Sequence, residues 1–355
     1  MSKIGVLTFH RCINFGSYWQ ARALVEGLRG RGHEAVVLDH RCDWASRREA
    51  RCAFQPLLPA RSTGDDMKKY GRKVRKVLAA VNELPSSRPF ALERPETMDE
   101  CDTVVVGSDE VWNLCHPWLG GRKAFFGEGV RAQRVISYAA SFGNQDARHG
   151  LPEEWAERLE RFDARSVRDD NSRTLLREVL DEDTDLVLDP VLQFPASTLA
   201  DLGDNPGMPP YLAIYGHSFP QSYAAAVRQY ARTAGLRLVS IGYRNDWADA
   251  QRLDVGPAEF SQLIAHSEAV ATNFFHGCVF ALLHRRPFAA VASEYRANKL
   301  RDLVRTLACE DRLVSSEPSC EQILRLLSEP LGSSIERAIT RRRAQSDRYL
   351  DRALA

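Results

Sequence analysis

The 355-residue sequence lacks paired cysteines, long apolar runs and an excess of charge of either sign. Its eight cysteines include no C-x-x-C pair, so their spacing argues against a structural zinc site and predicts reduced, mostly buried thiols. No apolar run approaches the roughly 20 residues that a membrane-spanning helix needs. The 48 basic and 47 acidic residues leave a formal charge of +1, which gives no electrostatic signature of binding to nucleic acid or to an anionic membrane.

We also expect no secretory signal. The first residues, MSKIGVLTF, run directly into a strand-like segment without the apolar region and cleavage site of a signal peptide. We therefore expect a cytoplasmic protein. The residues that are present, 44% hydrophobic and 27% charged, are typical of soluble globular proteins, and the length predicts about two domains.

Short apolar runs alternate with helical patterns along most of the chain. Residues 4–9 form a buried-strand pattern, apolar residues recur at helical spacing across 18–28, and residues 35–38 form a second apolar run. This βαβ order predicts a parallel sheet with a right-handed crossover. Residues 200–210 are rich in Gly, Pro and Asp and are predicted to link this first series to a second one.

The pattern predicts an α/β fold of two Rossmann-like, doubly wound domains that face each other across a cleft. We expect domains at residues 1–199 and 211–330, with residues 331–355 as a helix that packs back on the first domain. Between two loops, a single helix is predicted around residues 67–82, and its basic residues are interpreted as a solvated face. Ligands of such sheets bind outside the carboxyl ends of the strands, so the loops that follow the strands are the candidate sites.

Two of these loops follow strands of the first series. In the loop after the first strand, Gly16 allows close backbone approach, and the next helix offers free N–H groups to an anion; the alternative is a plain turn capped by Ser17. After residues 103–106, Ser108 and Asp109 suit recognition of a hydroxyl group or proton transfer from an alcohol. The alternative there is that Asp109 caps the following helix.

Three further loops carry candidate residues. Ser141 lies in SYAASFG, again just past a strand. Arg168, in SVRDD, has the geometry to bind a carboxylate or phosphate, or it pairs only with Asp169 or Asp170. His276, in TNFFHG, lies between a strand end and a helix start, which is compatible with a catalytic role or with a structural one.

Taken together and in this order, NFGSYWQARAL, GSDEVWN, SYAASFG, SVRDDNS, LDPVL and FFHG resemble the polysaccharide pyruvyl transferase family. The resemblance runs from about residue 3 to residue 307, and GSDEVWN followed by SYAASFG is its most specific part. It implies a GT-B-like fold. The implied activity is transfer of the enolpyruvyl group of phosphoenolpyruvate onto saccharide hydroxyls, which forms a pyruvate ketal in exopolysaccharide or cell-surface glycan biosynthesis.

The resemblance also implies roles for individual residues. His276 matches the motif histidine and is expected to be the general acid or base, while Asp109 is expected to orient or deprotonate the acceptor hydroxyl. Arg168 matches the arginine of the S-x-R motif and is expected to hold the anionic donor, with Arg296 and Lys299 as further candidates for its phosphate. The expected acceptor side is lined by Asn14, Gly16, Ser108 and Ser141.

The expected partners are a small anionic donor and a saccharide or lipid-linked saccharide acceptor. No cofactor is expected apart from phosphoenolpyruvate as co-substrate, and no metal. One motif departs from the family, which often reads T-D-S-F-H-G or R-x-H-G where this chain has Asn273 and Phe274. A polar or cationic donor contact is therefore missing, so either other groups hold the donor or the donor differs. The alternatives are a GT-B-like transferase that uses a nucleotide-sugar and a non-catalytic saccharide-binding protein.

Overall fold

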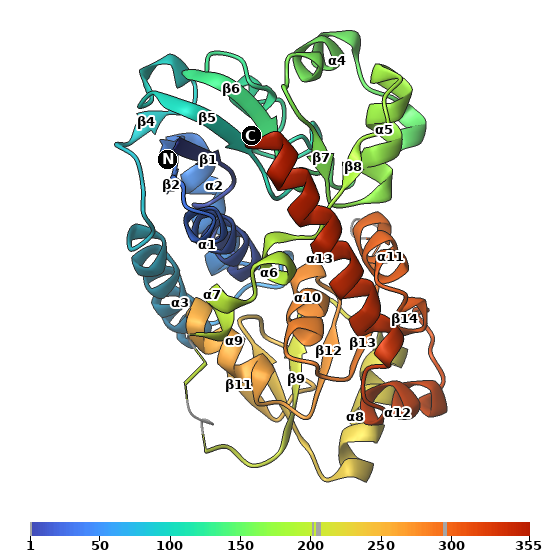
Figure 1. Cartoon of the computed structure of the whole chain (residues 1–355). Coiled ribbons are helices and arrows are strands. Elements are labelled where there is room, and N and C mark those ends of the chain that lie inside the picture. Colours follow the sequence, from blue (N-terminus) through green and yellow to red (C-terminus); the bar gives the residue numbers. More distant parts are fainter. Residues whose placement is uncertain (1, 201, 204–206, 294–296) are drawn as a thin grey trace. The chain divides into compact units, whose positions relative to one another are not determined.

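A computed structural model describes residues 2–200, 202–203, 207–293 and 297–355 of the chain (Figure 1). These residues fold into two compact units. Unit 1 is made of Met1–Glu49, Val81–Ser197 and Ile339–Ala355, and unit 2 is made of Ala50–Ala80 and Thr198–Ala338. In the described part of the chain, no helix is both long enough and apolar enough to cross a membrane.

Unit 1 is built on a four-stranded parallel sheet with the order β2-β1-β5-β6. Its strands are β1 (Lys3–Leu7), β2 (Glu34–Val37), β5 (Cys101–Val106) and β6 (Ala132–Ser137). Ile4 of the central strand β1 pairs with Ala35 on one side and with Thr103 on the other. The predicted βαβ opening is confirmed, because α1 (Phe15–Gly30) connects the parallel neighbours β1 and β2.

Shorter elements complete unit 1. Two small parallel pairs join β3 (His40–Arg41) to β4 (Phe90–Ala91) and β7 (Ser166–Val167) to β8 (Asp185–Leu186). The remaining helices that begin or end in this unit are α2 (Asp43–Phe54), α4 (Glu153–Glu160), α5 (Asp170–Leu180), α6 (Pro190–Gln193), α7 (Ala196–Leu199) and α13 (Ser333–Ala353). Apolar side chains from β1, β5 and the loops after them form one buried core around Trp112 and Phe125.

Unit 2 is built on a six-stranded parallel sheet with the order β11-β10-β9-β12-β13-β14. Its strands are β9 (Tyr211–Tyr215), β10 (Arg237–Ile241), β11 (Ala250–Arg252), β12 (Ala269–Thr272), β13 (Phe288–Val291) and β14 (Leu313–Val314). Its helices are α3 (Gly64–Asn82), α8 (Gln221–Ala234), α9 (Pro257–Ala265), α10 (Phe275–Leu283), α11 (Ala297–Thr306) and α12 (Cys320–Ser328). The α/β class with parallel sheets is therefore confirmed in both units.

The division into units differs from the predicted domain boundaries at residues 50–80. The sequence analysis assigned them to the first domain, but α3 makes its polar contacts within unit 2. Arg72 pairs with Asp254 at 2.9 Å, and Lys76 pairs with Glu259 at 2.7 Å. The same segment holds two helices, α2 and α3, rather than the single one expected. Of its basic residues, Lys73 is buried, whereas Lys68, Arg72, Arg75 and Lys76 are exposed.

The C-terminal helix α13 contributes its residues from Ile339 onward to unit 1. Its Tyr349 hydroxyl donates to the backbone oxygen of Ser137 at the end of β6, at 2.5 Å. Ser346 accepts a hydrogen bond from the Leu188 amide at 2.9 Å. These buried contacts anchor the last turns of the helix to the sheet of unit 1.

Candidate functional site

A strained loop follows β5 and places Asp109 in the interior of unit 1. Gly107 has a φ of +112°, and a Cβ there would lie 2.4 Å from the backbone oxygen of Tyr138, so only glycine fits. Asp109 has a φ of +81°. For a non-glycine residue, this backbone conformation costs on the order of 1–3 kcal/mol, and such conformations are concentrated at functional sites. The fold therefore holds this carboxylate in a position that the backbone would not adopt on its own.

Three groups hold the Asp109 carboxylate. The Ser17 hydroxyl donates to Oδ2 at 2.7 Å, while Arg168 Nη2 and the Glu110 amide donate to Oδ1 at 3.2 and 2.9 Å. The alternative that Asp109 caps a helix is wrong, because turns follow it and the next helical segment is a 3-10 helix at Lys123–Phe126. Asp109 thus joins the first turn of α1 to the arginine that directly follows β7.

Arg168 is buried between two carboxylates. Its second contact is from Nη1 to Asp189 Oδ2 at 2.9 Å, and the side chains of Arg168 and Asp189 are 2% and 1% exposed. Burial lowers the pKa of the guanidinium, but the charges of Asp109 and Asp189 outweigh burial and raise it above its ordinary value. Asp169, one of the two alternative partners expected for Arg168, caps α5 by accepting from the Ser172 amide at 2.8 Å.

The residues predicted for the acceptor side differ in exposure. Asn14 is exposed and caps α1 by accepting from the Gly16 amide at 2.8 Å, so the cap is Asn14 and not Ser17. Ser108 and Ser141 are fully buried. The Ser108 hydroxyl donates to Gln20 Oε1 at 3.0 Å, and the Ser141 hydroxyl accepts from a backbone amide two residues on, at 2.9 Å. The hydroxyl groups of both serines therefore form hydrogen bonds with other residues of unit 1.

Sequence reasoning missed Glu49, which α2 brings to the loop after β1. Its carboxylate accepts from the Trp118 indole at 2.7 Å and from the Ile13 amide at 3.1 Å. Burial raises the pKa of Glu49, and the nearby charge of Asp109 adds to this effect. No signal in the sequence marks it, because α2 shows no apolar periodicity around this residue.

A second buried charge cluster, also missed, lies beside the same loop. Asp39 accepts from Arg11 Nε at 2.6 Å and lies 3.2 Å from His10 Nε2. Burial raises the pKa of Asp39, but its bonds to His10 and Arg11 outweigh burial and hold it well below its usual range. Burial lowers the pKa of the neighbouring His40 to about 3, so this imidazole is neutral at physiological pH.

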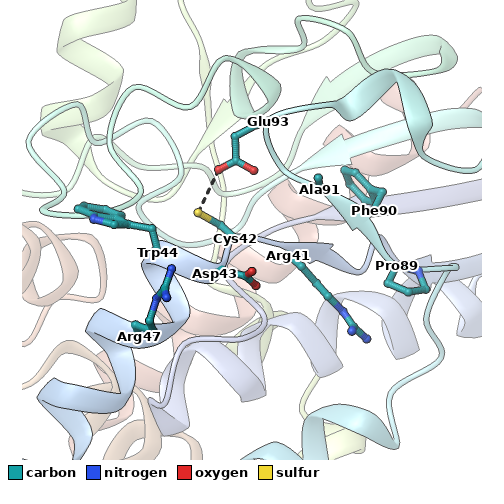
Figure 2. A pocket seen from close by; sticks show the side chains of 9 residues that line it. All are labelled: Arg41, Cys42, Asp43, Trp44, Arg47, Pro89, Phe90, Ala91 and Glu93. Carbon is teal, nitrogen blue, oxygen red and sulfur yellow. Dashed lines mark hydrogen bonds between the residues drawn. The ribbon is translucent and has the colours of Figure 1, made fainter.

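A surface pocket of about 520 Å³ lies in unit 1 at the start of α2 and beside β4 (Figure 2). It is lined by Arg41, Cys42, Asp43, Trp44, Arg47, Pro89, Phe90, Ala91 and Glu93. Figure 2 shows Trp44 and Arg47 on one side of Cys42, and Arg41 extending toward Pro89 on the other side. Trp44 is 43% exposed and the Arg48 guanidinium lies over its ring, 5.1 Å from the centroid, so the pocket is lined by a partly covered indole and two guanidinium groups.

His276 and Lys299 lie in unit 2. His276 is the second residue of α10, directly after the loop that leaves β12, and it is 8% exposed. Lys299 lies in the first turn of α11 and is also 8% exposed. Arg296, the other predicted phosphate contact, lies outside the described residues. The structure therefore gathers Ser17, Asp109 and Arg168 within unit 1, where Asn14, Gly16, Ser108 and Ser141 also lie, and it places His276 and Lys299 in unit 2.

The loop before α10 contains the residues that depart from the expected motif. The ring of Phe274 packs edge-to-face on Tyr215, with centroids 5.0 Å apart. The Asn273 amide donates to the backbone oxygen of His217 at 2.7 Å. Both side chains therefore contact other residues of unit 2. Among the residues that the structure describes, no group of three or more His, Cys, Asp or Glu side chains is arranged to hold a metal ion.

Comparison with known proteins gives a family and a fold. A family model described as polysaccharide pyruvyl transferase matches residues 14–295. No curated protein matches the sequence. Among solved structures, a Listeria monocytogenes protein assigned as a UDP-N-acetylglucosamine 2-epimerase is 13% identical, with a TM-score of 0.52 and coverage of 98% of this chain and 94% of that one. The UDP-GlcNAc 2-epimerase of Neisseria meningitidis, bound to UDP-GlcNAc, is 10% identical, with a TM-score of 0.49 and coverage of 98% and 94%.

At these sequence identities the similarity concerns the fold alone. The Listeria structure, with a TM-score of 0.52, supports the assignment of the fold. The GT-B-like class predicted from the sequence, with two Rossmann-like parallel α/β units, is confirmed. The family match includes every motif residue from Asn14 to His276 that the sequence analysis named. Because the matched family is one of transferases, the chain is an enzyme of the transferase class.

Proposed function

The chain belongs to the polysaccharide pyruvyl transferase family, and on this premise we propose that it transfers the enolpyruvyl group of phosphoenolpyruvate onto saccharide hydroxyls. The observation that carries the proposal is the family match across residues 14–295, which includes the held carboxylate of Asp109 and the histidine at the start of α10. The proposed setting is the synthesis of exopolysaccharide or cell-surface glycan in the cytoplasm.

The reaction needs an acid, an oriented hydroxyl and positive charge. Protonation of the methylene carbon of phosphoenolpyruvate creates an oxocarbenium-like centre at its C2, and an acceptor hydroxyl attacks that carbon and loses its proton. Phosphate then leaves with the C–O bonding pair, and a second acceptor hydroxyl closes the ketal and releases a proton. One hydroxyl proton replaces the proton taken up by carbon and the other goes to the departing phosphate, so the products are the ketal and hydrogen phosphate and the charges balance.

His276 is the proposed acid for the methylene carbon. An imidazole can hold or release a proton near neutral pH, which suits a step that consumes one proton and later returns it. Its place on the first turn of α10, after the carboxyl end of β12, is where ligands of such sheets bind. Lys299 and Arg296 remain the proposed contacts for the donor phosphate.

Asp109 is the proposed group that orients the acceptor hydroxyl. Its carboxylate is fixed by Ser17 and Arg168, and a carboxylate held by several donors keeps one orientation. For Arg168, the geometry favours positioning of Asp109 over the direct donor contact that the resemblance implies, because both terminal nitrogens already bind carboxylates. Asn14 and Gly16 are proposed to line the acceptor side, while the buried Ser108 and Ser141 support the loops behind it.

The pocket of Figure 2 is the proposed binding place for part of the acceptor. Sugar rings stack on indoles, and the partly exposed Trp44 offers one. Arg41 and Arg47 favour an acceptor that carries carboxylate or phosphate groups, such as an acidic saccharide or a lipid-linked precursor. The pocket lies in unit 1, as do Asn14, Gly16 and Asp109, the other residues proposed for the acceptor side.

Phe274 supports a second candidate, a transfer from a different donor such as a nucleotide-sugar. An apolar ring stands where a cationic contact was expected, and it packs on Tyr215 rather than offering charge. A non-catalytic saccharide-binding role is the third candidate. The three are separated by incubating the purified protein with phosphoenolpyruvate or UDP-N-acetylglucosamine and candidate acceptors, and by following release of phosphate or of UDP.

We expect phosphate release that depends on both phosphoenolpyruvate and acceptor. The His276→Ala variant should lose it, and the His266→Ala variant, changed at another histidine of unit 2, should keep it. Release of UDP alone would favour the nucleotide-sugar donor. Binding of saccharide without release of either product would favour the non-catalytic role, and both outcomes would contradict the proposed pyruvyl transfer.

A further inference from the structure

Three partly exposed aromatic side chains lie at the carboxyl edge of the sheet of unit 2. His217, Tyr243 and Phe274 each stand two residues beyond the end of a strand, namely β9, β10 and β12. These strands are neighbours in the order β10-β9-β12. Since parallel strands end at the same edge, the three rings converge at the place where ligands of doubly wound sheets bind. We call these three residues the aromatic platform.

The rings of the aromatic platform contact one another in a fixed geometry. The Phe274 ring lies 5.1 Å from Tyr243 and 5.4 Å from His217, at interplanar angles of 88° and 85°. His217 and Tyr243 lie 5.3 Å apart at 43°. The backbone before His217 is equally constrained, because Gly216 has a φ of +145° and a Cβ there would lie 2.1 Å from Asn273 Oδ1. The platform is therefore preorganised.

A buried lysine lies against one face of the platform. Lys73 reaches from α3 and places Nζ 4.2 Å from the centre of the Tyr243 ring, while donating to the backbone oxygen of Gly242 at 3.0 Å. Its side chain is only 3% exposed. Burial lowers the pKa of this ammonium to about 7, so holding its charge here is costly. A buried, charge-bearing lysine next to an open aromatic cluster needs a reason beyond packing.

Two ion pairs of α3 that precede Lys73 along the helix keep the lysine in register with Tyr243. Asp66 pairs with Arg244 at 3.1 Å. Arg72, the residue directly before Lys73, pairs with Asp254 at 2.9 Å. Both partners belong to the connections that follow β10 and β11. Lys73 is thus held at the ring by the helix as a whole, and not by its own flexible side chain.

We propose that the aromatic platform is the subsite for the planar carboxylate end of the donor, and that Lys73 supplies the positive charge for it through the Tyr243 ring. The inference rests on the proposed function, because the enolpyruvate group of phosphoenolpyruvate is such a planar, conjugated anion. The partly positive ring edges and the ammonium behind Tyr243 attract a carboxylate. Phe274 lies two residues before His276, so a donor on the platform is brought near the proposed acid.

This assignment explains how a chain with Phe274 in its histidine motif can still bind an anionic donor. The positive charge comes from α3, an element far away in the sequence, and not from the motif itself. Tyr243 and Phe274 are the residues that contact the ligand. Lys73 is a positioning residue that acts through Tyr243, and its substitution should change binding without unfolding the protein.

The test is the affinity for phosphoenolpyruvate, measured by titration calorimetry on the full chain. We expect the Lys73→Met variant to bind about tenfold or more weakly than wild type, because the positive charge behind the Tyr243 ring is lost. The Lys68→Met variant is the matched control on the same helix, since its side chain is 75% exposed, and it should bind as wild type does. Lys73→Arg should restore most of the affinity, and Tyr243→Leu should lose it as Lys73→Met does.

Thermal unfolding separates this role from a structural one. Removal of a buried charge should leave the melting temperature of Lys73→Met equal to or above that of wild type, so weaker binding would not reflect misfolding. Equal affinities of wild type and Lys73→Met would overturn the subsite and leave the proposed function intact. Lys73-dependent binding without phosphate release from any acceptor would support the subsite and contradict pyruvyl transfer. Absence of phosphoenolpyruvate binding to wild type would overturn both.

Discussion

Replacement of Asp189 by alanine removes one of the two carboxylates that hold Arg168 in unit 1. The pair joins Arg168 Nη1 to Asp189 Oδ2 at 2.9 Å, and both side chains are nearly inaccessible to water. Breaking a buried pair by removing one partner costs about 3–5 kcal/mol, because the other charge stays buried. Asp189 also caps α6 by accepting from the Val191 amide, which adds about 1 kcal/mol. We therefore expect a loss of at least about 4 kcal/mol in the free energy of unfolding.

The matched control is Asp183→Ala, which breaks an exposed arginine–aspartate pair. Arg173 Nη2 lies 2.6 Å from Asp183 Oδ1, but the two side chains are 37% and 70% exposed. Such surface pairs contribute roughly 0–1 kcal/mol and are screened by salt. Unit 1 contains the fully buried Trp19 and Trp112, so urea unfolding can be followed by tryptophan fluorescence. Similar losses in the two variants would refute the view that a buried ion pair organises this site.

Three further predictions concern charge and activity. Burial lowers the pKa of Lys73 from 10.5 to about 7. Between pH 7 and 10.5 the unfolded chain therefore binds one more proton at Lys73 than the folded chain does. The free energy of unfolding of the wild type should rise with pH over this range, by roughly 5 kcal/mol at most. The urea midpoint of the wild type should rise with pH over this range, and that of Lys73→Met should rise less. An equal pH dependence in the two proteins would contradict a buried charge at Lys73. Asp109→Asn should lower kcat for phosphate release at least about 100-fold in protein that is still folded, and it should also lower the melting temperature, because the buried pair with Arg168 loses one charge. Wild-type turnover would exclude Asp109 from the site. His276→Ala should lower kcat by about 100-fold or more while phosphoenolpyruvate still binds, and largely intact turnover would remove His276 as the acid.

The strands of unit 2 could be predicted closely from the sequence. Residues 211–215 and 288–291 are short apolar runs that each begin directly after a proline, and β9 and β13 have these same bounds. Buried parallel strands are covered on both faces, so they leave a continuous apolar signal. The helix α2 leaves no such signal, because Ala45 is its single fully buried residue among those described. The two edge strands of the sheet leave no clear signal either, because β11 contains no apolar run and β14 is only two residues long.

The sequence could predict which loops form the candidate site, but not which side chains in those loops contact one another. Asp109 and Arg168 were found because each follows a strand, but their shared partner network depends on Asp189, which lies 21 residues beyond Arg168. The interpretation of the basic residues on α3 as a solvated face was wrong for Lys73. Its partner Gly242 lies 169 residues away, and no local pattern reveals which face of an isolated helix becomes buried.

The central claim is pyruvyl transfer, and mass analysis of the acceptor tests it most directly. Purified protein is incubated with phosphoenolpyruvate and a panel of acidic and lipid-linked saccharides, and each acceptor is analysed beside the phosphate that is released. The account predicts an acceptor that gains the elements of pyruvate less one water, in equal amount to phosphate, and no such product with His276→Ala. Transfer of a sugar from a nucleotide-sugar to the same acceptors, with phosphoenolpyruvate left unchanged, would contradict the account.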